Sequence, residues 1–110
     1  MRAAPGEEAA ARDSGLGPEQ LDALRPHLVN LNMGSFSTEG ETKTTQGDVD
    51  AMFEQHLPKA LRAAKAAGEK LRVVLYAHGG LVSESDGLRI AHKHVGWWME
   101  NHVYPVYFVW

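Results

Sequence analysis

Apolar residues along the chain recur with two different periods, which predict helices and strands. From Val49 to Ala64 they fall every three or four positions, which predicts an amphipathic helix with Asp48 as its N-cap, a kink at Pro58 and an end at Gly68. A second face of this kind predicts a helix from Ser85 to about residue 100, with N-caps among residues 83–86. Its apolar positions are Leu88, Ala91, Val95, Trp98 and Met99. A short helix is also expected after Pro18.

Three short apolar runs predict strands at His27–Met33, Leu71–Ala77 and Val106–Trp110. The run LRVVLYA is mostly apolar and rich in Val and Leu, as is typical of a strand buried on both faces. Residues 35–46 are rich in Ser, Thr and Gly and predict a long loop. Strands that alternate with helices indicate an α/β fold, a three-layer βαβαβ unit with a mainly parallel sheet.

The chain divides into residues 1–17, a flexible leader, and residues 18–110, an α/β domain. Because the sequence stops at Trp110 inside an apolar run, we expect the domain to be incomplete at its C-terminus. A sheet of only these strands would expose apolar edges and lack cover on one side. We therefore expect that copies of the chain can associate through the strand edge at residues 106–110.

Composition narrows the classes of function. The 110 residues are 44% hydrophobic and 23% charged, which is ordinary for a globular domain, and the net charge of −3 predicts no nucleic-acid partner. No apolar run approaches the roughly 20 residues that span a bilayer. The absence of cysteine excludes disulfides and thiolate chemistry within this chain, and a cytoplasmic location is the default expectation.

The segment with the most chemical information is the HGGL sequence that follows the strand Leu71–Ala77. Glycines directly after a strand let the backbone turn sharply and bring its amides close to a ligand. The carboxyl ends of strands in open α/β sheets are the places where ligands bind. The same glycines would also suit a plain β–α turn, so the residue types alone leave both interpretations open.

This strand-then-HGG pattern resembles the oxyanion loop of α/β-hydrolases, in particular HGG-type serine esterases and lipases. The resemblance covers residues 71–110. It implies that the amides of Gly79, Gly80 and Leu81 face a substrate carbonyl oxygen, and that His78 shapes the loop instead of serving as the triad base. It also implies an ester or other acyl substrate and no cofactor.

The chain departs from this family in its missing nucleophile. None of the five serines lies in a G-x-S-x-G elbow, and in the family the elbow, the acid and the triad histidine all follow the strand equivalent to Val106–Trp110. We therefore expect the N-terminal portion of a hydrolase-like protein, without a catalytic residue of its own and inactive alone.

Two alternatives stay open. Caspase-like cysteine peptidases also place a His-Gly pair at the end of a strand, which would make His78 catalytic. The third possibility is a non-catalytic α/β interaction module.

Residues 79–87 match neither a dinucleotide-binding fingerprint nor a P-loop. No metal site is expected, because His92 and His94 would point about 200° apart on a helix. Helix capping explains the cluster at residues 83–86, and Glu39, Glu41 and Asp48 are expected to be solvated.

Overall fold

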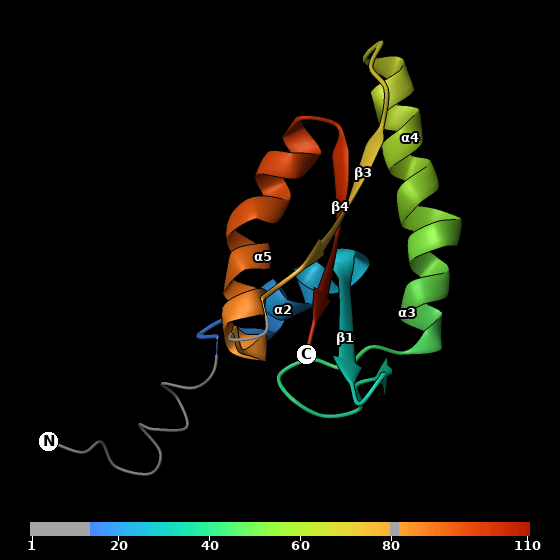
Figure 1. Cartoon of the computed structure of the whole chain (residues 1–110). Coiled ribbons are helices and arrows are strands. Elements are labelled where there is room, and N and C mark those ends of the chain that lie inside the picture. The colour runs from blue at the N-terminus through green and yellow to red at the C-terminus, as the bar shows by residue number, and fades with distance from the viewer. Residues whose placement is uncertain (1–13, 80–81) are drawn as a thin grey trace, which may run out of the picture.

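The computed structural model describes residues 14–79 and 82–110, which form three layers with a sheet between two groups of helices (Figure 1). The elements, in chain order, are α2 (Pro18–Leu24), the 3-10 helix η1 (Arg25–His27), β1 (Leu28–Asn32), β2 (Ser35–Phe36), α3 (Gln46–Ala51), the π-helix η2 (Met52–His56), α4 (Leu57–Ala66), β3 (Arg72–Ala77), α5 (Glu84–Glu100) and β4 (Val103–Val109).

The four strands lie in the order β2-β1-β4-β3. β1 and β3 both run parallel to β4, whereas β2 is antiparallel to β1 and forms a hairpin inside the segment predicted as a loop. The chain passes from β1 to the outer strand β3 through α3, η2 and α4, and then returns to the central strand β4 through α5. The α/β prediction with a mainly parallel sheet is therefore confirmed.

The prediction that Leu71–Ala77 is buried on both faces is wrong. β3 pairs only with β4 and forms one edge of the described sheet, and five of its six residues are exposed. The central strand is β4, so the expected edge at 106–110 is also wrong, because β1 and β3 flank this strand. Sequence could not separate the two strands, since both are short apolar runs.

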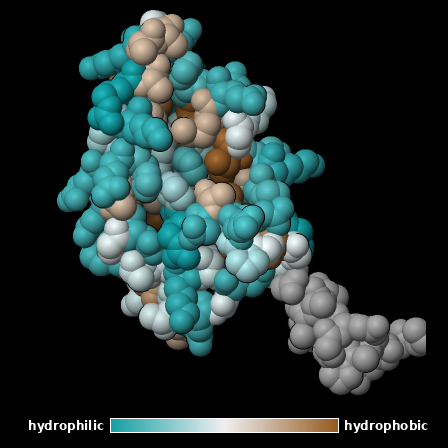
Figure 2. All heavy atoms as spheres, turned by 180° about the vertical axis from the view of Figure 1, so that it is seen from behind, coloured by the Kyte–Doolittle hydropathy of each residue, from teal (hydrophilic) through white to brown (hydrophobic). Residues whose placement is uncertain are grey.

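The back of the molecule is mainly hydrophilic, with a hydrophobic region that reaches the surface (Figure 2).

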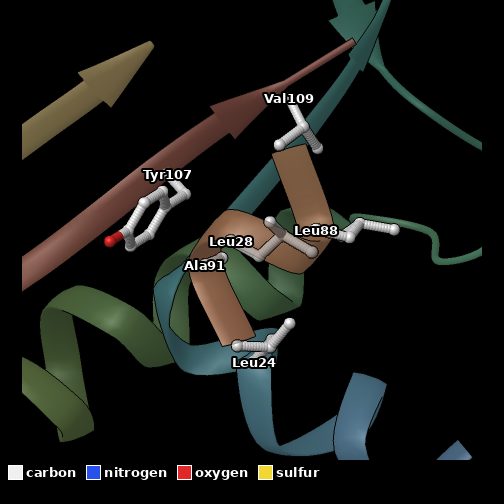
Figure 3. Close-up of a cluster of buried hydrophobic side chains, with 6 residues drawn as sticks. All are labelled: Leu24, Leu28, Leu88, Ala91, Tyr107 and Val109. Carbon is white, nitrogen blue, oxygen red and sulfur yellow. The ribbon is translucent and has the colours of Figure 1, made fainter. Parts of the chain in front are cut away.

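Helices cover both faces of the sheet, so the expectation of one uncovered face is wrong as well. On one face, α5 and α2 pack against β1 and β4 (Figure 3). The buried side chains there are Leu24, Leu28, Leu88, Ala91, Tyr107 and Val109. On the other face, η2 and α4 contribute Met52 and Ala60 to a second cluster with Val29, Tyr104 and Val106. Burial of these side chains is the main stabilising term, at about 25 cal/mol per Å² of apolar surface.

Pro105 lies in the middle of the central strand β4, whereas the predicted strand began only at Val106. The Arg72 N–H bonds to the His102 carbonyl, so alternation along β4 directs the backbone groups of residue 105 toward β1. β1 begins to pair only at Tyr107, so the missing N–H of Pro105 costs no ladder bond. At this gap the Nδ1 of His27 lies 2.9 Å from the Pro105 carbonyl oxygen and donates to it.

The helix termini follow capping chemistry. Thr45, not Asp48, caps α3: its hydroxyl accepts from the Asp48 N–H, and the Asp48 carboxylate accepts from the Thr45 N–H at 2.8 Å. The π-helix η2 ends two residues before Pro58, where the sequence predicted a kink, and α4 begins at Leu57. The predicted N-cap at Ser83 is confirmed, since its hydroxyl accepts from the Asp86 N–H.

Ser14 belongs to the fold, although it was assigned to the leader. It is buried, and both its N–H and its hydroxyl donate to the Glu41 carboxylate. Leu16 packs against the cluster under α5. Residues 1–13 lie outside the described part of the chain. Among the residues that are described, no helix combines the length and apolar character needed to cross a membrane.

Candidate functional site

The predicted oxyanion loop begins where β3 ends. His78 and Gly79 follow Ala77, the last residue of β3, whereas Gly80 and Leu81 lie outside the described residues. Ala77 is paired with Phe108, so this loop starts beside the end of β4. It also lies just before the capped N-terminus of α5. His78 and Gly79 therefore lie at the carboxyl edge of the parallel strands, where α/β proteins bind ligands.

His78 is buried, and both of its ring nitrogens are engaged. Its Nε2 accepts a hydrogen bond from the Trp110 N–H at 3.1 Å, and its Nδ1 lies 2.9 Å from the Gly79 carbonyl oxygen. The imidazole also stacks on the Trp110 indole, with 3.7 Å between the ring centroids. In the parallel ladder, the Trp110 N–H would otherwise bond to the main-chain carbonyl of residue 78. The His78 side chain thus replaces a main-chain carbonyl as the acceptor of the Trp110 N–H at the end of the ladder.

These partners determine the tautomer of His78. A backbone N–H can only donate, so Nε2 carries no proton, and a carbonyl oxygen can only accept, so Nδ1 carries it. A catalytic base needs a ring nitrogen that can take a proton from the substrate or nucleophile. In this arrangement neither nitrogen is free for that task, which disfavours the caspase-like alternative with His78 as a catalytic residue.

Gly87 lets α5 approach this corner closely, and the sequence analysis did not single it out. A Cβ at this position would lie 2.8 Å from Val109 Cγ1 and 3.0 Å from the Cδ2 of His78. Only glycine fits there without a shift of the neighbours. A glycine in the first turn of a helix, where any other residue would be a better helix former, was the available signal.

A second polar group lies on the neighbouring part of the same edge, where the loop 37–45 meets the start of α5. Glu84 accepts from the Glu41 N–H and from the Asn30 side-chain amide, each at 2.9 Å. Ser85 and Ser14 both donate to the Glu41 carboxylate. The expectation that Glu41 is solvated is therefore wrong. No sequence pattern indicated these contacts, which join residues 27 to 54 positions apart.

The hydrogen-bond partners of Glu41 favour the charged form of its carboxyl group. Burial alone would raise the pKa of its carboxyl group, but the hydrogen bonds from Ser14 and Ser85 together outweigh burial and hold the pKa below its usual value. Gly40 completes the contact with a φ of +89°, and a Cβ there would lie 2.5 Å from the Glu84 Oε2. The loop is thus held tightly against the helix N-terminus.

Asn30 is fully buried in this group, and its Oδ1 has no hydrogen-bond partner within the described residues. Its amide nitrogen donates to the Thr42 carbonyl and to Glu84, and its main-chain N–H donates to the Thr44 hydroxyl. The side-chain orientation is fixed by these acceptors. Asn30 therefore ties β1 to both sides of the loop contact.

An open cleft of about 310 Å³ lies between these two polar groups. Trp110, Glu84 and Glu39 line it, together with Leu31, Asn32, Ser37 and Gly40. It is smaller than the cleft of about 450 Å³ between α2 and residues 40–45, but that larger cleft does not include the end of β4. The smaller cleft reaches Trp110, whose indole contacts the His78 ring, but neither His78 nor Gly79 lines it.

The remaining candidates are structural. Asp86 pairs with Arg89, whose hydrogen bond is the main cause of the lowered pKa of the Asp86 carboxyl group. His27 is buried between Tyr104 and Pro105. In the described residues, no three His, Cys, Asp or Glu side chains gather as a metal site would require. Comparisons with protein-family models, curated proteins and solved structures found no significant match.

Proposed function

We propose that the segment His78–Leu81 is the oxyanion loop of an α/β-hydrolase-like protein that acts on an ester or another acyl substrate. In this proposal, backbone amides of the loop stabilise the negative charge that develops on the substrate carbonyl oxygen. Each such donor contributes about 3–4 kcal/mol of transition-state stabilisation in known enzymes. A cytoplasmic location is part of the proposal and rests on the sequence alone.

The observation that carries the proposal is the use of both His78 ring nitrogens. A histidine that bonds to the Gly79 carbonyl and to the Trp110 N–H orients the peptide at the start of the loop and joins it to the central strand. This is the positioning role that the resemblance assigns to it. An oxyanion loop requires such support, because its donors stabilise charge only when they are held in place before the reaction.

The nucleophile, in this proposal, comes from outside the described residues. Ser14 and Ser85 donate to Glu41, Ser37 donates to the Glu39 carbonyl, and Ser83 caps α5. None of these described bonds joins a serine to a histidine, as the bond of an activated serine would. In this proposal the 110-residue chain contributes the oxyanion loop but no nucleophile, so we expect it to be inactive alone.

The experiment combines the gene with a covalent probe. The reading frame after the Trp110 codon is determined, and both the whole gene product and the 110-residue chain are treated with a fluorophosphonate, which labels activated serines. We expect a G-x-S-x-G segment followed by an acid and a histidine, and labelling of the whole product only. A whole product that lacks this segment and takes up no label contradicts the proposal.

A second candidate function is favoured by one specific observation, the exposed outer strand β3. A non-catalytic interaction module would present such a strand to a partner. The same probe separates the two candidates, because a module without an activated serine takes up no label in either form.

A further inference from the structure

The outer edge of β3 has unpaired backbone groups. Because the Arg72 N–H bonds to the His102 carbonyl on β4, strand alternation directs the N–H and C=O of Arg72, Val74 and Tyr76 toward β4. The corresponding groups of residues 73, 75 and 77 then point away from the sheet. No described strand lies beyond β3. The edge thus presents three donors and three acceptors in a regular row.

Apolar side chains surround this row. Leu75 is 68% exposed and Val73 is 52% exposed, and both lie on the sheet face that α4 covers, since they are paired with Val106 and Tyr104. Proteins usually protect an edge strand with proline, a bulge or several charges. β3 contains no proline, and its only charged residue is Arg72 at its first position. An edge of this kind is suited to pairing with another strand.

We propose that β3 pairs antiparallel with β3 of a second copy of this chain, so that two four-stranded sheets join into one. A two-fold axis perpendicular to the sheet makes the strands antiparallel and keeps the helices of both copies on matching faces. Leu75 then lies opposite the partner's Leu75, and Val73 lies opposite the partner's Ala77. All three outward-facing residues fall in hydrogen-bonded pairs, so each free donor meets a free acceptor.

The side chains are also compatible in this register. On the face that α5 covers, Val74 lies opposite the partner's Tyr76, an apolar pair of the type that stabilises sheets. Each Arg72 lies beside the partner's His78, so the two arginines are at opposite ends of the interface and do not repel each other. A second copy therefore pairs the free hydrogen-bonding groups and covers the apolar surface, and it keeps the two arginines apart. This inference does not use the oxyanion loop, but in the longer protein of that proposal it requires that the added segments leave the β3 edge free.

The test compares the mass of the chain in solution over a wide concentration range, by sedimentation equilibrium, for wild type and two variants. Leu75→Lys places a charge at the centre of the interface, and Met33→Lys makes the same change in charge at a fully exposed turn by the opposite edge. We expect a concentration-dependent doubling of mass for wild type and Met33→Lys, and the monomer mass for Leu75→Lys. A wild-type chain that stays monomeric, or a Leu75→Lys variant that still dimerises, overturns the proposal.

Amide hydrogen exchange on the wild-type chain provides a readout that needs no variant. The amides of Val74 and Tyr76 bond to β4 and should exchange slowly at every concentration, which also verifies that the sheet is folded. The Leu75 amide should exchange more slowly only when the chain dimerises. The whole gene product is measured in the same way. If it is monomeric with a protected Leu75 amide, a segment of the same polypeptide fills the edge and the second copy is excluded.

Discussion

The main-chain N–H of Trp110, just beyond the central strand, donates to the imidazole of His78, at the end of the edge strand, over 3.1 Å. Residues 32 positions apart are joined there by a side chain in place of a main-chain carbonyl. The contact couples the start of the HGG loop to the end of β4. It explains why this histidine is buried at a position where loop residues are usually exposed.

Replacement of His78 by phenylalanine tests this contact. The aromatic ring keeps the stacking on Trp110 but removes the acceptor for its N–H, so we expect the free energy of unfolding to fall by about 1–3 kcal/mol. His92→Phe is the control, because His92 is exposed on α5, and it should change stability by less than about 0.5 kcal/mol. Urea denaturation measures both. Equal effects of the two substitutions would show that the hydrogen bond contributes nothing.

Two glycines of the same helix should respond oppositely to alanine. Gly96→Ala adds a Cβ with no other atom within 4 Å, and should stabilise the protein by about 0.5–1 kcal/mol through helix propensity. Gly87→Ala forces a Cβ against Val109 and His78, and should destabilise it by about 1–3 kcal/mol. Thermal unfolding of both variants gives the comparison. A stabilised Gly87→Ala protein would mean that α5 does not lie this close to β4.

A similar pair isolates the contact between the loop 37–45 and Glu84. Gly34 and Gly40 both have positive φ, but a Cβ at Gly34 meets nothing within 4 Å. Gly34→Ala should therefore cost only the backbone strain, about 1–2 kcal/mol. Gly40→Ala should cost about 1–3 kcal/mol more, because it displaces the carboxylate that Asn30 and Glu41 bond to. Denaturant midpoints that agree for the two variants would contradict this contact.

Stability should depend on pH through His27. Burial, as the largest effect, lowers the pKa of its imidazole below 6.5; His56 lowers it further, while the bond to Pro105 opposes the shift. Below pH 6.5 the unfolded chain therefore binds a proton that the folded chain does not, and stability is lost as pH falls from 6.5 toward the folded pKa. His27→Gln should reduce this slope between pH 7 and pH 5.

Glu41 contributes in a separate range. Its folded pKa is lowered, so its contribution is present above its ordinary pKa of 4.5 and is lost as pH falls through the folded value. Above pH 5, the difference in urea midpoint between wild type and His27→Gln therefore reports on His27 and not on Glu41. An unchanged slope in His27→Gln would show that this histidine does not carry the effect.

The sequence predicted the elements well but not the order of the strands. Periodicity located the helices around Met52 and Leu88 because their apolar positions face a core. It could not place LRVVLYA at an edge and VYPVYFV at the centre, because both runs are apolar and the second contains a proline. That proline is tolerated in a central strand only because β1 is too short to pair with it, which is a property of the neighbouring strand.

For the candidate site, too, the sequence indicated one part and not the contacts around it. The HGG segment stands out by residue type, since glycines that follow a strand have a local signature. The contact of Glu41 with Ser14 and Ser85 has none, because it joins three distant polar segments. The contact between Trp110 and His78 could not be predicted from the sequence either, because it depends on the pairing and register of β3 and β4.

The ¹⁵N spectrum of the His78 imidazole in the folded chain shows directly which ring nitrogen carries the proton. We expect a neutral ring with the proton on Nδ1 and none on Nε2, because the Gly79 carbonyl accepts and the Trp110 N–H donates. A ring protonated on Nε2 would contradict it. His78 would then have no bond to Trp110 and would be available as a base, as the cysteine-peptidase alternative requires.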